Sequence, residues 1–509
     1  MLAFPDIVVL VLYCAIIVAV GAWFGRRQTN MQDYFLGGRR IPWWAAGLSI
    51  IATETSALTF IGAPATAYAT DWQYFQLAIG SVLARFLLAF LLINVFYTSK
   101  VFTPYGYLQK RFGDGTKNAA AGVFILGRVF ASAFRLLGFA IAIKVVLNLP
   151  LSMAILITGV VAVLYTYLGG IRAVIWTDVL QGAVFMGGAC ITIYFLIKGI
   201  PGGWGGFMAV SEASHKLLTF DSGFDAGGFK WNDAYNLVTG FIGGCFLTLA
   251  THGTDHDMVQ RMLTCKDSKG GRRSLVLSGL LNFPVVVIFL LIGSLLFVYY
   301  RTVPVSYALP EQYKYIFPTF IVRGLPVGLS GLIIAGLVAA AMSSLDSALS
   351  ALASTTVVDF YRPYIRRDAS EAHYLKVSRG LTVFWGAVLV GVALSVGATE
   401  DILAAGLGVM TLFYGSLLGV FLLARFTERG NTLTNTTGMA LSILFLVFLN
   451  NKAAILTALG ITEGGLFEVN IAWPWFTVIG TLVTFGIGAM GRKRSRPSVR
   501  SDGSAQENG

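Results

Sequence analysis

Long runs of apolar residues, separated by short polar or glycine-rich segments, make up most of the chain. A helix that crosses a bilayer needs about 20 consecutive, mostly apolar residues. By that rule the sequence contains thirteen candidate spans, at residues 6–25, 43–69, 74–97, 121–147, 151–169, 174–198, 237–260, 274–300, 317–357, 378–397, 402–424, 434–450 and 471–490. We therefore expect an all-α membrane protein with about 13 transmembrane helices, some of which must tilt or break because their apolar runs are long.

The composition supports this interpretation. Of the 509 residues, 56% are hydrophobic and only 12% are charged, whereas soluble domains carry about 25% charged residues. A chain with so few charges cannot cover a water-facing surface, which excludes a cytosolic enzyme and, despite the net charge of +12, a nucleic-acid-binding protein. We expect one transmembrane domain at residues 1–491, followed by a basic, then polar and disordered tail at 492–509.

The loops between the spans differ in charge. If the segment around residues 26–40 lies in the cytoplasm and the sides alternate from there, most of the 37 Lys and Arg residues fall in cytoplasmic segments. The positive-inside rule then places the N-terminus outside and the C-terminus in the cytoplasm of a multi-pass protein of the plasma (inner) membrane. This distribution also accounts for the net charge without an acidic partner.

Motifs of energy coupling and catalysis are absent from the sequence. There is no Walker loop ending in GK[ST], no GxSxG nucleophile turn and no HExxH zinc motif. We therefore expect neither an enzyme nor an ATP-driven pump, and secondary transport becomes the leading hypothesis.

Two spans carry polar interruptions in matching places. Residues 51–64 combine a polar centre with Gly62 and Pro64, and six of the eight residues at 250–257 are polar. These spans are the first helices of two five-helix groups, which predicts a five-plus-five inverted repeat: repeat one at 43–198, repeat two at 237–424, one extra helix at 6–25 and extra helices at 434–490. The alternative is that 250–257 simply lies near a membrane end.

Charged side chains within spans are functional candidates, because each costs at least about 2.5 kcal/mol in a bilayer. They are Glu54, Arg128, Arg135, Asp178 and Asp346. Arg128 is as well suited to pair with Glu54 as to bind a solute, and Arg135 could serve another acidic partner. For Arg85 and Lys144 we expect local pairing or snorkelling towards the interface.

The ninth span carries hydroxyls at helical spacing. Ala340, Ser343 and Ser344 share one face, and Ser343, Asp346 and Ser347 repeat it one turn later. Sodium takes oxygen ligands, so two such faces could form two ion sites. The alternative is helix packing, because small residues allow close approach and their hydroxyls bond back to the helix.

Several sequence stretches together resemble the signature of the sodium:solute symporter family. They are YTYLGGIRAVIWTDVLQ at 165–181, residues 340–347 followed by DFYRP at 359–363, VQR at 259–261 and DYFLGG at 33–38. The family includes sodium/glucose, sodium/iodide, sodium/multivitamin and bacterial sodium/sialic acid transporters. The resemblance implies the amino-acid-transporter-like inverted-repeat fold with broken first helices, secondary active transport by alternating access, and sodium as the coupling ion.

The resemblance also implies ion ligands. The shared sodium would bind the carbonyls of Ala52, Thr55 and Ala340 and the hydroxyls of Ser343 and Ser344. A second sodium would bind Asp178, Ser343, Asp346 and Ser347. The sialic acid transporters have a serine at the position of Asp346, and the extra carboxylate could strengthen this site or take a proton instead.

The stretch 53–59 resembles the solute-contacting stretch of sugar and sialic acid transporters. The implied solute residues are Glu54, Ser56, Thr59, Tyr74, Arg128, Asp255 and His256. An arginine in a Gly-Arg-Val sequence favours a carboxylated sugar or an organic acid, since the guanidinium fork suits a carboxylate. A neutral sugar or polyol, and proton coupling, remain alternatives, and the oligomeric state is open.

Overall fold

The computed structural model describes residues 3–25, 30–168, 170–397, 401–458 and 470–492. Within these residues nearly all regular structure is helical, and ten helices are long and apolar enough to cross a membrane. One bent pair and two shorter apolar helices cover the remaining predicted spans. The all-α prediction is therefore confirmed, while the count of thirteen spans stays a prediction. The predicted tail, 492–509, lies outside the described residues except for Arg492.

The first five-span group runs from α3 to α10. Its helices are α3 (Trp43–Glu54), α4 (Ala57–Ala69), α5 (Phe75–Leu91), α6 (Ile93–Thr98), α7 (Tyr105–Phe112), α8 (Asp114–Leu147), α9 (Leu151–Leu168) and α10 (Ile171–Gly199). Helices α3 and α4 form the bent pair, at an angle of 57°. This is the broken first helix that the sequence predicts.

The second group runs from α12 to α18. Its helices are α12 (Leu237–Thr254), α13 (His256–Leu263), α14 (Ser268–Thr302), the 3₁₀ turn Tyr313–Tyr315, α15 (Ile316–Arg323), α16 (Leu329–Thr355), a π-helix (Thr356–Ile365), α17 (Glu371–Val396) and α18 (Ile402–Phe426). Asp255 interrupts the first helix with φ −75° and ψ 123°. The five-plus-five arrangement with interrupted first helices therefore describes the fold.

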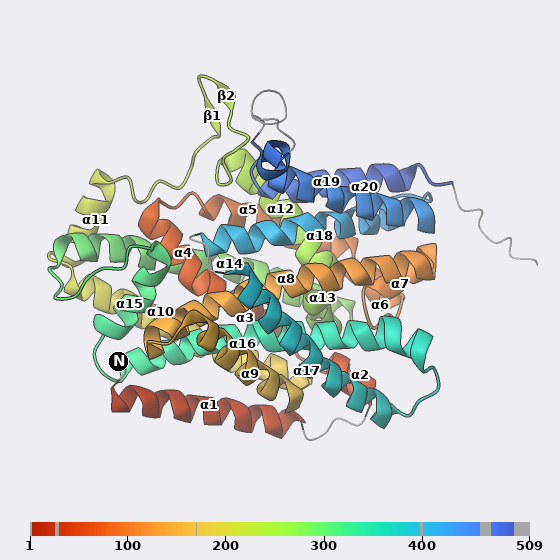
Figure 1. Ribbon diagram of the computed structural model, residues 1–509, viewed down its shortest axis with the longest axis horizontal. Helices are drawn as coiled ribbons and strands as arrows, with labels where there is room; N and C mark the ends of the chain where they lie inside the picture. The colour runs from red at the N-terminus through yellow and green to blue at the C-terminus, as the bar shows by residue number, and fades with distance from the viewer. Residues whose placement is uncertain (1–2, 26–29, 169, 398–400, 459–469, 493–509) are drawn as a thin grey trace, which may run out of the picture.

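The remaining elements flank these groups. They are α1 (Phe4–Gly25), α2 (Met31–Leu36) with the turn Gly37–Arg39, α11 (Gly203–Ala213), the antiparallel strands β1 (Phe224–Asp225) and β2 (Gly228–Phe229), α19 (Thr432–Ala458) and α20 (Pro474–Ala489). Figure 1 shows α1 along one side of the bundle and α19 along the opposite side. Helix α11 lies at the end of the bundle away from α6 and α7, and the β-hairpin projects from the side on which α19 lies.

Helix α16 lies at the centre of the bundle. In the most apolar stretch of 18 residues within α16 and the π-helix that follows it, 94% of the stretch is buried. In the corresponding stretch of α1, 22% is buried. Asp6 of α1 fixes the start of α16, because its Oδ1 accepts hydrogen bonds from the amides of Gly328 (2.7 Å) and Gly331 (2.8 Å). The hydroxyl-bearing helix is therefore held in a fixed position and packed on all sides.

The first break lies in the polar centre that the sequence indicated, directly after Glu54, at Thr55 and Ser56. Gly62 and Pro64, which also marked this span, lie inside an intact α4. The predicted span 317–357 is divided between α15 and α16. Pro326, which has no amide to donate, and Gly328, at φ 90°, account for that interruption.

Candidate functional site

The break between α3 and α4 leaves backbone carbonyls available. Thr55 ends α3 at φ −78° and ψ 74°, and the amide of Ser56 donates to the carbonyl of Glu54 (2.9 Å) rather than to that of Ala52. Within the described residues, no backbone amide outside the helices donates to the carbonyls of Ala52 or Thr55. Two of the predicted sodium ligands are therefore carbonyls that the break has freed.

Helix α16 presents its hydroxyls to this break. The hydroxyls of Ser343 and Thr53 lie 3.3 Å apart, which places α16 directly against α3. Ser344 Oγ donates to the carbonyl of Ala340 (2.6 Å), and Ser347 Oγ donates to that of Ser343 (2.8 Å). The oxygens predicted to bind the first sodium thus come from two elements in contact.

The second predicted ion group contains two fully buried carboxylates. Asp178 Oδ2 accepts from the hydroxyl of Ser49 (2.5 Å) and from Arg261 Nη2 (3.3 Å). Asp346 Oδ1 accepts from the amide of Ser347 (2.6 Å). One oxygen of each carboxylate, Asp178 Oδ1 and Asp346 Oδ2, has no hydrogen-bond partner in the described part of the chain. Carboxylate oxygens for a further cation are therefore present.

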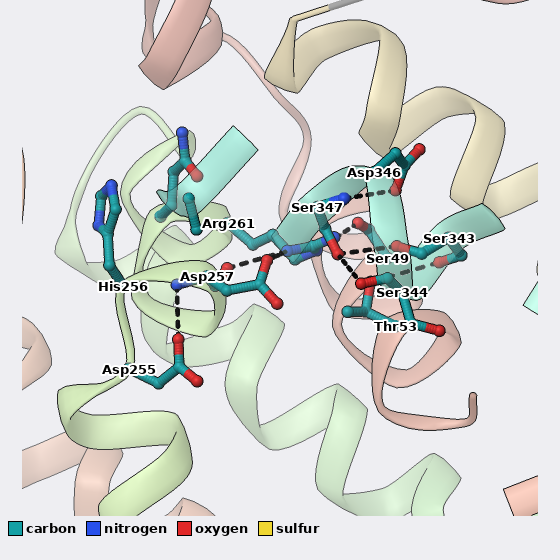
Figure 2. A network of polar contacts seen from close by, with 12 residues as sticks. Ser49, Thr53, Asp255, His256, Asp257, Arg261, Ser343, Ser344, Asp346 and Ser347 are labelled. Atoms are coloured by element: carbon teal, nitrogen blue, oxygen red, sulfur yellow. Dashed lines mark hydrogen bonds and ion pairs between the residues drawn. The ribbon is translucent and has the colours of Figure 1, made fainter. Parts of the chain in front are cut away.

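A chain of ion pairs leads from this group to α8. Arg261 Nη1 contacts Asp257 Oδ1 (2.6 Å), and Asp257 Oδ2 pairs with Arg128 Nη2. Arg128 Nη1 also contacts Asp255 Oδ2 (3.1 Å), which accepts from the hydroxyl of Tyr414 (2.6 Å). Figure 2 shows Arg261 between Asp257 on α13 and the hydroxyl residues of α3 and α16. Both Nη atoms of Arg128 are therefore paired with carboxylates at the break, those of Asp255 and Asp257.

Glu54 does not pair with Arg128, the partner that the sequence interpretation considered for it. Its carboxylate pairs with Arg85 Nη2 and lies 3.7 Å from His252 Nε2, so the pairing of Arg128 with Glu54 is wrong. Arg85 is fully buried and does not snorkel, because Glu54 compensates its charge inside the bundle. Lys144 does pair locally, with its Nζ 5.2 Å from the ring centroid of Tyr315.

A cavity next to the break gathers most of the predicted solute residues. Its lining includes Glu54, Thr55, Ser56, Thr59, Tyr74, Arg128 and Asp255, and also Arg135, Thr248, Thr251, His252 and Asn282. His256 does not line it: its Nε2 lies 2.8 Å from Ser354 Oγ, because α13 turns the ring towards α16. Residues 251–265 are buried throughout, so the polar stretch at 250–257 lies inside the protein.

Arg135 is the second guanidinium of α8 at this cavity. It is 8% exposed, and within the described residues it takes part in no ion pair. Its Nη1 is buried without a hydrogen-bond partner. The seven-residue spacing in the sequence was the signal for both arginines, but it does not show that Arg128 pairs with Asp255 and Asp257 while Arg135 stays unpaired among the residues that the structure describes.

Comparisons with known proteins extend over most of the chain. A model of the sodium:solute symporter family matches residues 34–441. The sodium/sialic acid symporter SiaT of Proteus mirabilis (strain HI4320) is 30% identical over 449 residues, which cover 87% of this chain and 88% of that protein. The sodium/sialic acid symporter NanT of Aliivibrio fischeri (strain ATCC 700601 / ES114) is 30% identical over 500 residues, covering 96% and 93%.

The fold is also similar to that of a solved transporter. The substrate-bound, outward-open structure of a Na+-coupled sialic acid symporter with a novel Na+ site superimposes with a TM-score of 0.82. The two chains are 28% identical, and the match covers 96% of this chain and 97% of the other. Sequence and architecture therefore agree along nearly the full length.

Proposed function

The chain belongs to the sodium:solute symporter family, and from that premise we propose that it imports a small carboxylated sugar or organic acid with sodium by alternating access. As a family member it is a sodium-coupled, multi-pass membrane transporter and not an enzyme. The proposal concerns the solute, the direction and the residues that bind each ligand.

The unpaired guanidinium of Arg135 is the observation that carries the solute class. A buried charge without a partner is costly, and an anionic solute would relieve that cost. Arg85 already compensates Glu54, so the acidic residue of the break does not repel an anion. A guanidinium fork binds carboxylates in a bidentate manner. The relatives that carry sialic acid, a carboxylated sugar, support the same class.

This assignment changes the expected role of Arg128. Its two Nη atoms hold Asp255 and Asp257, so we assign it to positioning the break at Asp255 and assign the solute carboxylate to Arg135. The polar contacts of the solute then come from Ser56, Thr59 and Tyr74, with Glu54 and Asp255 at the edges. His252 takes the place that the sequence interpretation gave to His256.

We assign the first sodium to the carbonyls of Ala52, Thr55 and Ala340 and the hydroxyls of Ser343 and Ser344. The hydroxyl of Ser344 now donates to the carbonyl of Ala340, and that of Ser343 lies 3.3 Å from the hydroxyl of Thr53; both would rotate to ligate the ion. An ion held there ties the break to α16. Because Thr55 and Ser56 also line the solute cavity, ion binding would order the solute site before the bundle closes.

We assign a second sodium to Asp178, Ser343, Asp346 and Ser347. Arg261 competes for Asp178, so the unpartnered oxygens of the two carboxylates are the donors left to the ion. For the whole chain, we propose the N-terminus outside and the C-terminus in the cytoplasm of the plasma membrane, as the distribution of basic residues predicts.

Uptake into proteoliposomes tests the proposed function. The purified chain is reconstituted, and accumulation of sialic acid, glucuronate and gluconate is compared with that of N-acetylmannosamine and sorbitol, with and without an inward sodium gradient. We expect sodium-dependent accumulation of at least one acid and none of the neutral compounds. Accumulation of only neutral compounds would reject the solute class, and sodium-free uptake driven by a pH gradient would reject sodium coupling.

A further inference from the structure

A cavity of about 660 Å³ lies outside the transport site, between the segments that precede α3 and α14. Its lining consists of residues 38–43, 265–267, 269 and 270, and Arg273. A parallel β-bridge joins Ile41 to Cys265, and the amide of Ile41 donates to the carbonyl of Thr264 (3.2 Å). The backbone therefore fixes the two walls to each other.

The lining is strongly basic. Five cationic side chains contribute to it: Arg39, Arg40, Lys266, Lys269 and Arg273. None of the five forms an ion pair within the described residues. The single carboxylate of the lining, Asp267, accepts a hydrogen bond from the amide of Gly270 (2.7 Å) and caps α14. The cavity thus concentrates five positive charges against one carboxylate, and none of the five is held in an ion pair within the described residues.

The backbone at its edge takes an unusual conformation. Gly37, Gly38 and Arg39 follow one another with φ of 58°, 64° and 54°. For an arginine this left-handed conformation is costly and needs support from its surroundings. Part of that support is visible, because the Arg39 guanidinium lies 5.5 Å from the ring centroid of Tyr97. The turn thereby brings two consecutive arginines to the cavity.

Aromatic residues place the cavity at the depth of lipid headgroups. Trp43 and Trp44, each 40% exposed, form the first turn of α3, and Trp43 also lines the cavity. Tryptophan is enriched where transmembrane helices leave the apolar layer. We propose that this cavity binds the phosphodiester headgroup of an anionic phospholipid. Basic pockets between transmembrane helices bind such headgroups, and guanidinium groups bind phosphate oxygens in pairs.

Lipid binding is testable on the full-length protein. Native mass spectrometry compares retention of phosphatidylglycerol and phosphatidylcholine with matched acyl chains. We expect the wild type to retain phosphatidylglycerol preferentially, and the triple variant Arg40→Gln/Lys269→Gln/Arg273→Gln to bind it at least tenfold more weakly. Retention by the triple variant equal to that of the wild type would overturn the proposal.

A matched control removes three exposed cations from the same end of the bundle: Arg366→Gln/Arg367→Gln/Lys376→Gln. This region adjoins α2, since the amide of Met31 donates to Glu371 Oε2 (2.9 Å). The control variant should keep the lipid preference. An equal loss of phosphatidylglycerol binding in both variants would show that binding depends only on net charge, and would overturn the proposed site.

Inorganic phosphate is the second probe, because a free anion offers the same chemistry. Phosphate that displaces phosphatidylglycerol at millimolar concentration would overturn the lipid assignment, and no displacement is expected. If the triple variant does not fold, the single variant Lys269→Gln takes its place, with an expected weakening of about threefold, and an unchanged affinity overturns the proposal. Sodium-dependent uptake does not enter these readouts, so they are independent of the proposed transport function.

Discussion

Arg128 and Arg135 show how similar residues on one helix take different roles. They lie seven residues apart on α8, which places them on one face. At Arg128 the helix passes the break at Asp255, where two carboxylates are buried, and at Arg135 it passes the solute cavity. The intramembrane position of both could be recognised in the sequence. Which of them is paired could not be recognised, because the partners of Arg128 come from residues more than 100 positions away.

We predict that Arg135→Gln weakens binding of a carboxylated solute by about 30- to 100-fold, the loss of one charge-assisted hydrogen-bond pair. Sodium binding in the absence of solute should be unchanged, because Arg135 is not among the proposed ion ligands. Isothermal titration calorimetry of the purified variant with and without sodium measures both effects.

Arg128→Gln is the contrasting variant. It leaves the carboxylates of Asp255 and Asp257 buried and short of a partner, a change that typically costs about 3–5 kcal/mol. We expect a lower yield of folded protein rather than a selective loss of solute affinity. Solute affinity that falls with Arg128→Gln but not with Arg135→Gln would reverse the two assignments.

The hydroxyl of Ser344 gives the sharpest test of the first ion site. Ser344→Ala removes one proposed ligand without adding volume, so we predict at least a tenfold rise in the sodium concentration that gives half-maximal uptake. Ser350→Ala on the same helix is the control, because its hydroxyl has no partner in the described residues and is not among the proposed ion ligands. Equal sodium dependence in both variants would remove Ser344 from the site.

At the scale of elements, the broken first helices could be predicted and their exact form could not. Polar residues in the middle of an apolar span must find partners, so Thr53 to Thr59 and Thr251 to Asp257 indicated interruptions. Pro64 lies in the same span but does not interrupt it, because α4 accommodates the proline within an intact helix. The direction in which His256 points depends on the turn at Asp255, which the sequence pattern does not reveal.

Close helix packing leads to a prediction at this scale. Helices α5 and α12 meet at Gly80, where a Cβ would lie 2.1 Å from the carbonyl oxygen of Phe241. Gly80→Ala must therefore push the two helices apart, and we expect a loss of about 2 kcal/mol or more in stability. Gly122→Ala on α8 is the control, since nothing lies within 4 Å of the added atom. Thermal unfolding of both variants in detergent measures the difference, and equal melting temperatures would contradict it.

The outer end of α4 is held by Lys216, which follows α11. Its Nζ donates to the carbonyls of Tyr68 (2.7 Å) and Thr70 (2.6 Å) and lies 4.0 Å from the ring centroid of Phe297. Burial lowers the pKa of Lys216 to about 8; Asp71 opposes this shift, and Arg301 adds to it. An unfolded lysine keeps its proton up to about pH 10.4.

Between these two pKa values the unfolded chain binds more protons than the folded one, so the stability that Lys216 contributes rises with pH. We predict that the melting temperature of the wild type, relative to Lys216→Met, increases between about pH 7 and pH 9.5 by about 2 °C or more. Lys198→Met, at an exposed position near the end of α10, should follow the wild type across this range. A difference that is constant or shrinks with pH would contradict the assignment.

At the scale of the whole molecule, the buried charges constrain the number of ions. Around the proposed ion sites and the solute cavity, four buried carboxylates, Asp178, Asp255, Asp257 and Asp346, face three guanidiniums, Arg128, Arg135 and Arg261, while Glu54 and Arg85 compensate each other. With one carboxylated solute bound, two sodium ions make this inventory neutral, and one sodium leaves an excess negative charge. Uncompensated charge is costly in the interior of a membrane protein, so the occluded state should contain two sodium ions and one anion.

This stoichiometry predicts that uptake of a monoanionic solute carries one net positive charge inwards and is therefore driven by voltage. An inside-negative potential of about 100 mV contributes roughly 2.3 kcal/mol per charge. In proteoliposomes, a potassium diffusion potential set with valinomycin should accelerate uptake several-fold.

Asp346→Asn removes one carboxylate and with it the need for the second ion, so its uptake should still require sodium but should no longer respond to the potential. If Asp346 instead takes a proton in place of the second sodium, voltage stimulation of the wild type will persist, but it will increase as the external pH falls. Equal voltage stimulation in Asp346→Asn and the wild type would exclude Asp346 from charge coupling altogether.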